Sequence, residues 1–231
     1  KNKDLKINIK SFQAINLRFK YPLNPKKKII DGLNISFKPK KITLITGTTG
    51  TGKTTLLDLL TGLIDPDKGY YKINNKKFLN LPSEWVNNIA YVSQNIALMN
   101  ASIQKNIMFG ENEKTINKFR LKKSIINAQL LRFIKNQKKG INTTIGERGS
   151  KISGGEKQRI ALARAFYSDK KVLILDEATN ALDEKNEKFI YENIFKLRGN
   201  QTILIVSHNI DNLENCDCIY EFKDQILIKK K

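Results

Sequence analysis

The clearest chemical signal in the chain is the segment 47–54, which fits the pattern G-x-x-x-x-G-K-[ST]. Its residues are Gly47, Thr48, Thr49, Gly50, Thr51, Gly52, Lys53 and Thr54. Three glycines allow the backbone to curl so that successive N–H groups face inward and surround an anion. Lys53 could then reach the β- and γ-phosphates of a nucleotide, and the Thr54 hydroxyl could coordinate Mg²⁺. The segment therefore predicts a phosphate-binding loop.

Two adjacent carboxylates, Asp176 and Glu177, follow the apolar run 172–175. If this run is a buried strand of a parallel sheet, both carboxylates stand at its carboxyl end, where such sheets bind ligands. Asp176 could hold Mg²⁺, directly or through water, and Glu177 could polarise an attacking water molecule. For this segment taken alone, the alternative is an acidic strand end that caps the next helix.

A third segment, 152–159, contains Ser153, Gly154, Gly155 and Glu156. The spacing of Ser153 and Glu156 is that of a capping box, which would begin a helix without any ligand. A capping box does not need the two glycines, because glycine lowers helix propensity. Bare backbone N–H groups at this position could instead bind an oxyanion. Both interpretations remain open for the segment by itself.

The elements that must position these segments can be predicted from hydrophobic periodicity. Residues 41–46 form an apolar strand that leads into the glycine-rich loop, and 54–61 form a short helix that ends at Gly62. Further strands are expected at 33–37, 70–73, 89–93, 172–175 and 202–206, and further helices between 102 and about 135, after Ser153, and from about 184 to 197. Apolar strands that alternate with helices indicate a parallel sheet buried on both faces.

Composition limits the classes of function. The chain has 231 residues, of which 40% are hydrophobic, so it is too apolar for a disordered protein. No apolar run approaches the roughly 18 residues of a membrane span. The formal net charge is +20, but 35 of the 42 basic residues are lysines scattered in pairs and triplets, which favours a solvated surface over a nucleic-acid site. Two cysteines, Cys216 and Cys218, are too few for a disulfide framework or a structural zinc site.

Together and in this order, the three segments resemble the nucleotide-binding domain of ATP-binding cassette (ABC) proteins, and the resemblance covers nearly all of the chain. It implies an α/β P-loop NTPase fold with a mainly parallel core sheet, an N-terminal antiparallel β layer and an inserted helical subdomain. We expect one domain over 1–231. Its ATP-binding core would comprise 1–94 and 166–231, and the helical subdomain with the signature motif would comprise 95–165.

The resemblance also implies roles for single residues. Tyr21 resembles the aromatic residue on which adenine stacks, Gln94 the glutamine that joins the core to the helical subdomain, and His208 the switch histidine. The residues implied to bind ATP are Tyr21, residues 47–54 and Thr55. Those implied to hold Mg²⁺ are Thr54, Gln94 and Asp176. Those implied to be catalytic are Glu177, His208, Gln94 and Lys53.

In this family two copies of the domain enclose two ATP molecules head to tail. The resemblance therefore implies that Ser153, Gly154, Gly155 and Glu156 contact ATP held by a second copy of the chain. Asp183, in the segment 180–183, resembles the loop that crosses to that copy. The expected activity is hydrolysis of Mg-ATP to ADP and phosphate by an ATP-dependent homodimer.

Two segments resemble exporters in particular. Glu147, Arg148 and Gly149 resemble a short element that touches the intracellular loops of a membrane domain, and 100–107 resembles the segment that follows the glutamine. We therefore expect the motor domain of an exporter at the cytoplasmic face of the cell membrane, cut from a longer polypeptide with its transmembrane domain upstream. The run 152–165 is also similar to bacteriocin or peptide exporters that carry a peptidase domain.

Some positions depart from the family pattern. Ile152 and Glu156 replace the commoner Leu and Gln of the signature, Met99 stands where exporters often have Phe, and the final strand pair turns on Asp224-Gln225 instead of Asp-Gly. Glu156 belongs to the segment implied to contact the second copy's ATP, and none of the other residues is an implied phosphate, metal or water contact.

The alternative function is a nucleic-acid-associated ABC ATPase of the repair, chromosome or translation class, which the charge of +20 favours. The chain contains no long heptad run, no cysteine zinc module and no second cassette, which such relatives carry. No specific nucleic acid is therefore expected as a partner.

Overall fold

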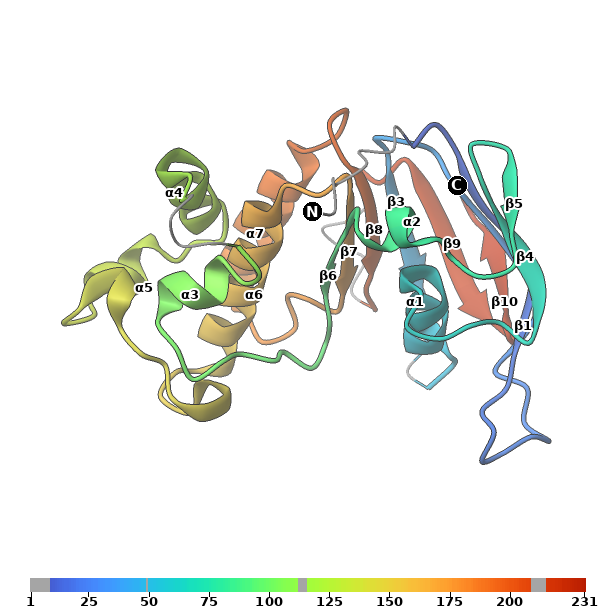
Figure 1. Ribbon diagram of the computed structural model, residues 1–231, viewed down its shortest axis with the longest axis horizontal. Helices are drawn as coiled ribbons and strands as arrows, with labels where there is room; N and C mark the ends of the chain where they lie inside the picture. Colours follow the sequence, from blue (N-terminus) through green and yellow to red (C-terminus); the bar gives the residue numbers. More distant parts are fainter. Residues whose placement is uncertain (1–8, 49, 112–115, 209–214) are drawn as a thin grey trace. The chain divides into compact units, whose positions relative to one another are not determined.

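The computed structural model describes residues 9–48, 50–111, 116–208 and 215–231 (Figure 1). The chain divides into two compact units. The first unit comprises residues 1–91, 171–176 and 197–231, and the second comprises 92–170 and 177–196.

A six-stranded sheet, in the order β10-β9-β3-β8-β7-β6, forms the base of the first unit. Its strands are β3 (Ile42–Thr46), β6 (Ile89–Val92), β7 (Val172–Asp176), β8 (Thr202–Val206), β9 (Cys218–Lys223) and β10 (Ile226–Lys229). Strand β3 runs parallel to β8 and β9, and β7 runs parallel to β8. Every residue of β7 and β8 is buried, as expected for parallel strands covered on both faces.

A second sheet of four antiparallel strands, in the order β2-β1-β4-β5, belongs to the same unit. It consists of β1 (Phe12–Phe19), β2 (Ile30–Phe37), β4 (Lys68–Ile73) and β5 (Lys76–Phe78). This sheet confirms the predicted N-terminal antiparallel layer, and the first sheet confirms the mainly parallel core.

Helix α1 (Lys53–Thr61) and the short helix α2 (Ser83–Val86) complete the core of the first unit. The Phe12 ring stacks on the Trp85 ring at a centroid distance of 4.1 Å, and the Trp85 indole N–H donates to the Leu60 carbonyl at 2.9 Å. These contacts fix the C-terminal half of α1 against the antiparallel sheet. The N-terminus of α1, which follows the glycine-rich loop, is thereby held in place.

The second unit is helical. Within its described residues, the helices are α3 (Ile103–Ile107), α4 (Lys118–Asn127), α5 (Leu131–Lys135), α6 (Gly154–Ser168) and α7 (Glu184–Phe195), and short 3₁₀ turns lie at Gly140–Asn142 and Glu147–Gly149. From α6, the half-buried Arg164 guanidinium donates to the carbonyls of Asn106 at 2.8 Å and Ala97 at 3.1 Å. It thus ties α6 to the segment around α3. No helix within the four described ranges has the length and apolar character that crossing a membrane requires.

The division into units differs from the predicted boundaries. The prediction kept 166–231 with the core, whereas residues 166–170 and 177–196 group with the helical unit. Polar contacts within that unit explain the difference. Gln158 of α6 accepts from the Ala181 N–H at 2.8 Å, and Asn193 of α7 donates to the Asn127 carbonyl at 3.1 Å.

Candidate nucleotide-binding and catalytic site

The glycine-rich loop connects β3 to α1 in the first unit, as predicted. Gly47, Gly50 and Gly52 have φ angles of 145°, 79° and 112°, a backbone conformation that residues other than glycine rarely adopt. A Cβ atom on Gly47 would also lie 2.6 Å from the Phe222 carbonyl oxygen. The loop therefore requires glycine for its conformation and for its close approach to β9. Thr49, another residue predicted to bind ATP, lies outside the described residues.

The N-terminus of α1 has no side-chain cap, whereas several other helices of the chain do. Gly52 occupies the N-cap position without a side-chain hydrogen bond, and no acidic residue lies in the first turn. By contrast, α4 is capped by Asn117, α6 by Ser153 and α7 by Asp183. The first-turn N–H groups of α1 are thus not used by a capping side chain. Such a terminus suits an anionic ligand such as a phosphate.

Lys53 is buried although it is a lysine, with 6% of its surface exposed. Its ammonium group donates to the carbonyls of Gly47 at 2.7 Å and Thr48 at 2.8 Å. These bonds place a positive charge inside the loop. The neighbouring Thr54 is exposed at the surface, where its hydroxyl can reach a ligand or ion.

Tyr21 lies beside the same loop–helix junction. Its hydroxyl is 3.1 Å from the Thr55 hydroxyl, and its ring meets the Phe19 ring edge-on, with a centroid distance of 5.0 Å. The Tyr21 side chain remains 41% exposed. The structure therefore brings together Tyr21, Thr55 and the loop, and it leaves part of the Tyr21 ring available for stacking.

Asp176 reaches the same edge of the sheet as the loop. Val206 of β8 pairs with Ile45 on one side and with Asp176 on the other, so the end of β7 lies level with the end of β3. Two strand spacings, about 10 Å, separate them. The buried Asp176 carboxylate accepts from the Tyr91 hydroxyl at 3.2 Å. Burial, and then the charge of Asp176, raises the pKa of Tyr91, which therefore remains a protonated donor.

The oxygen groups at this edge fit a magnesium ion that is shared with phosphates. Mg²⁺ binds one or two protein oxygens and completes its shell with phosphate oxygens and water. The Thr54 hydroxyl and the Asp176 carboxylate supply such oxygens in the first unit. In the described part of the chain, no three His, Cys, Asp or Glu side chains gather into a metal site.

Glu177 begins the stretch of the second unit that follows β7. Its Oε2 atom accepts from the Gln94 side-chain amide at 3.0 Å and from the Asn180 side-chain amide at 2.8 Å. Its φ angle is 48°, a left-handed conformation that costs a non-glycine residue about 1 kcal/mol. The structure thus brings together Glu177 and Gln94, which were both implied to be catalytic, and adds Asn180. Its position three residues after Glu177, in a turn, was the available sequence signal for this contact.

The segment around Ser153 forms the predicted capping box at the start of α6. The Ser153 hydroxyl accepts from the Glu156 N–H at 3.3 Å, and the Glu156 carboxylate accepts from the Ser153 N–H at 2.7 Å. A Cβ atom on Gly155 would lie 2.9 Å from the Ala181 carbonyl oxygen, and one on Gly154 would lie 3.6 Å from Ala181 Cβ. Close packing of the 180–183 loop is therefore a second reason for glycine here, in addition to bare N–H groups.

Asp183, at the end of that loop, is the N-cap of α7. Its carboxylate accepts from the Asn186 N–H at 3.0 Å, and this hydrogen bond lowers the pKa of Asp183. His208 is exposed in the first unit, two residues after the end of β8, and β8 is the strand that pairs with β7. His208 therefore follows the strand that lies next to the one ending at Asp176.

The predicted exporter element forms an exposed turn in the second unit. Glu147 and Arg148 are exposed, whereas Gly149 is buried. A Cβ atom on Gly149 would lie 3.3 Å from Leu98 Cδ1. The turn therefore packs beside the segment that follows Gln94, where a hollow of about 210 Å³ is lined by Met99, Gln104, Lys105, Met108, Phe109, Gly110 and Glu111.

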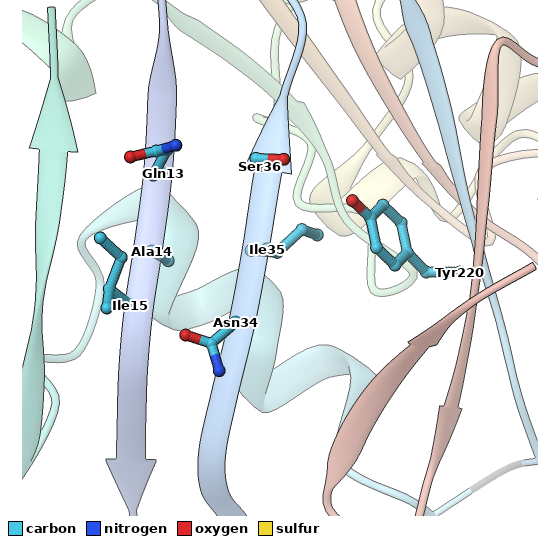
Figure 2. A pocket seen from close by; sticks show the side chains of 7 residues that line it. All are labelled: Gln13, Ala14, Ile15, Asn34, Ile35, Ser36 and Tyr220. Carbon is cyan, nitrogen blue, oxygen red and sulfur yellow. The ribbon is translucent and has the colours of Figure 1, made fainter. Parts of the chain in front are cut away.

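A separate hollow of about 330 Å³ lies on the first unit, and Figure 2 shows the Tyr220 ring pointing toward β2 there. It is lined by Gln13, Ala14, Ile15, Asn34, Ile35, Ser36 and Tyr220. None of the predicted site residues lines it, so this hollow is not the candidate site.

Comparisons with known proteins agree with this geometry. A family model described as "ABC transporter" matches residues 30–180. The chain is 33% identical over 216 residues to "ABC transporter B family member 21" of Arabidopsis thaliana, and 35% identical over 216 residues to "Multidrug resistance protein pgp-1" of Caenorhabditis elegans. Each alignment covers 93% of this chain and 16% of the relative.

The chain therefore spans about a sixth of the length of these two curated relatives. Among solved structures, it is similar to "Structure of a bacterial Atm1-family ABC exporter with ATP bound". That similarity has a TM-score of 0.88 and a sequence identity of 28%, and it covers 96% of this chain and 38% of the solved one.

Proposed function

The chain belongs to the ABC transporter family, and we propose that it is the ATP-binding and ATP-hydrolysing motor domain of an exporter. The observation that carries the ATP-binding part is the phosphate loop itself. Its buried Lys53 and the uncapped start of α1 lie at the same sheet edge as Asp176. ATP is the nucleotide bound in the similar Atm1-family structure.

In the proposed reaction, Lys53 and the N–H groups at the start of α1 hold the β- and γ-phosphates. Thr54, Asp176 and Gln94 would hold Mg²⁺, which neutralises charge on the phosphate oxygens when it is bound. Glu177 accepts the proton of a water molecule whose oxygen attacks the γ-phosphorus. The bond between the γ-phosphorus and the bridging oxygen breaks, which leaves ADP and phosphate. Tyr21 would stack on adenine, and His208 would contact the γ-phosphate.

A second copy of the chain is the proposed partner at Ser153, Gly154, Gly155 and Glu156. The N-terminus of α6, with its positive dipole end, would face ATP held by that copy. In the described chain Ser153 is satisfied by its capping box, so the contact would be made by the N–H groups of the glycines and by the outer side of the Ser153 hydroxyl. Asp183 would lie at the same interface.

The ATPase rate per subunit is expected to rise with protein concentration, because each composite site needs two copies. Phosphate release measured from nanomolar to tens of micromolar enzyme tests this, with light scattering to record dimer formation. A total rate strictly proportional to enzyme over that range, in a preparation shown to be monomeric, would contradict the composite site.

The exporter part of the proposal rests on the relatives' names and on one surface of the second unit. Glu147 and Arg148 are exposed in a turn whose Gly149 packs on Leu98. The next residue, Met99, lines a hollow together with Phe109, and these two side chains are 39% and 58% exposed. Exposed apolar side chains next to charged ones are typical of a docking surface. A transmembrane domain of the transporter is the proposed partner there, which would place the chain at the cytoplasmic face of a membrane.

Charge reversal of this element, Glu147→Lys with Arg148→Glu, is expected to leave ATP affinity of the chain within about twofold, because surface substitutions away from a site have small effects. In the full-length transporter the same change should abolish the coupling between ATP hydrolysis and transport. Fluorescent-nucleotide titration and vesicle transport measure the two quantities, with Lys138→Glu/Lys139→Glu on the same unit as a control. Normal coupled transport in the double variant would argue against the proposed docking surface.

The nucleic-acid alternative finds no support in the comparisons. The matched family is described as a transporter family, one named relative is an ABC transporter and the solved neighbour is an ABC exporter. The net charge of +20 remains the one feature in its favour.

A further inference from the structure

Asn180 contacts the carboxylate proposed as the base although its side chain had no predicted role. Its side-chain amide donates to Glu177 Oε2 at 2.8 Å, and its backbone N–H donates to the Glu177 carbonyl at 3.3 Å. Asn180 therefore binds both the side-chain carboxylate and the backbone carbonyl of Glu177 within one turn. Gln94 donates to the same Oε2 atom at 3.0 Å from a different segment of the second unit.

Two neutral N–H donors on one carboxylate oxygen restrict the rotation of the Glu177 side chain. Both bonds join an N–H donor to a charged acceptor, and such bonds are stronger than those between neutral groups. With Oε2 held by Gln94 and Asn180, the position of Oε1 is fixed as well, because a carboxylate is planar. A base that is held in this way loses less orientational freedom when it accepts a proton from a bound water molecule.

The backbone on both sides of Asn180 is itself anchored. On one side, the buried Thr179 hydroxyl lies 2.7 Å from a Glu187 carboxylate oxygen and 3.0 Å from the Tyr191 hydroxyl, both on α7. On the other side, the buried Gln158 of α6 accepts from the Ala181 N–H at 2.8 Å. The turn that carries Asn180 is therefore fixed on both sides by hydrogen bonds to α6 and α7.

We propose that Asn180 is a positioning residue. Together with Gln94, it orients the Glu177 carboxylate to accept a proton from the water molecule that attacks the γ-phosphorus. The inference rests on the proposed ATPase function. Asn180 acts through Glu177 and does not itself exchange a proton with the substrate. Helix α6, which begins with the proposed contact to the second copy's ATP, sets the position of Asn180 through Gln158.

The test is a double-mutant cycle between Asn180→Ala and Glu177→Gln. Asn180→Ala is expected to lower kcat by about 10- to 100-fold, since a small misplacement of a catalytic group has effects of that size. The KM for ATP should stay within about twofold, because binding of the ground state is not affected. In the Glu177→Gln background, Asn180→Ala should change the residual rate by less than about twofold, because the base on which it acts is already gone.

Single-turnover hydrolysis of radiolabelled ATP gives the rates, and fluorescent-nucleotide titration gives ATP affinity independently of turnover. Asn180→Asp keeps the size of the side chain while removing its N–H donors, so it should lose kcat as well even if Asn180→Ala destabilises the loop. Asn136→Ala, at an exposed asparagine of the same unit, is the control and should behave as wild type.

If the kcat losses of Asn180→Ala and Glu177→Gln simply multiply in the double variant, the positioning role is overturned, since Asn180 would then not act through Glu177. Full kcat in both Asn180→Ala and Asn180→Asp would overturn it too. A wild-type chain that binds ATP and does not hydrolyse it as a dimer would instead overturn the proposed ATPase function. The two failures are therefore distinguishable.

Discussion

Replacement of Lys53 by Ala is expected to weaken ATP binding by at least about 100-fold. The ammonium group lies inside the glycine-rich loop, 2.7 and 2.8 Å from two of its carbonyl oxygens. Two hydrogen bonds from a charged donor to phosphate oxygens contribute about 3 kcal/mol or more together, which corresponds to about two orders of magnitude in Kd. Removal of the side chain also takes a donor from the Gly47 and Thr48 carbonyls, so the loop itself would lose its closed form.

Fluorescent-nucleotide titration measures this loss directly. Lys53→Met should give nearly the same result, because it keeps the bulk of the buried stem and removes the charged N–H donors. The variant therefore separates the role of the ammonium group from a packing defect. Lys76→Ala removes an exposed lysine of β5 in the same unit and should bind ATP as wild type does. Affinity close to wild type in Lys53→Met, with an unchanged melting temperature, would refute the assignment of the loop.

Much of the first unit could be predicted because its signals are local. The apolar runs at 172–175 and 202–206 became β7 and β8, and the glycine spacing at 47–52 placed the loop between β3 and α1. Even the departure at Asp224-Gln225 has a local explanation. These residues adopt φ angles of 48° and 68°, the left-handed pair that a two-residue hairpin turn requires, although neither is glycine.

Features that depend on contacts between distant segments could not be predicted in the same way. The grouping of α7 with the helical unit depends on Asn193 and Asn127, which are 66 positions apart. The need for glycine at position 155 depends on the Ala181 carbonyl, which no local pattern places beside it. The capping box at Ser153, one of the two interpretations left open for that segment, is present in the structure, and it could be inferred because both of its hydrogen bonds span only three residues.

Glu177→Gln is expected to lower the rate of ATP hydrolysis by about 10²–10⁴-fold while ATP binding is kept. The amide has the shape of the carboxylate but cannot accept a proton from water. Its oxygen can still accept from Gln94 and Asn180, so the hydrogen bonds that hold position 177 are preserved. The backbone also needs no change, since the φ angle of 48° makes the same demand on Gln as on Glu. The variant thus removes one function from the site and leaves its geometry.

Retained binding without hydrolysis has a consequence for assembly. If ATP holds two copies of the chain together and hydrolysis separates them, the Glu177→Gln chain should accumulate as a dimer in Mg-ATP. Size-exclusion chromatography with light scattering would record this dimer, and it should disappear when Lys53→Met is added, because the second change prevents ATP binding. Glu192→Gln, at an exposed position of α7, is the control. It should hydrolyse ATP normally and show the same proportions of monomer and dimer as the wild type. A Glu177→Gln chain that hydrolyses ATP at half the wild-type rate would show that the proton is accepted by another group.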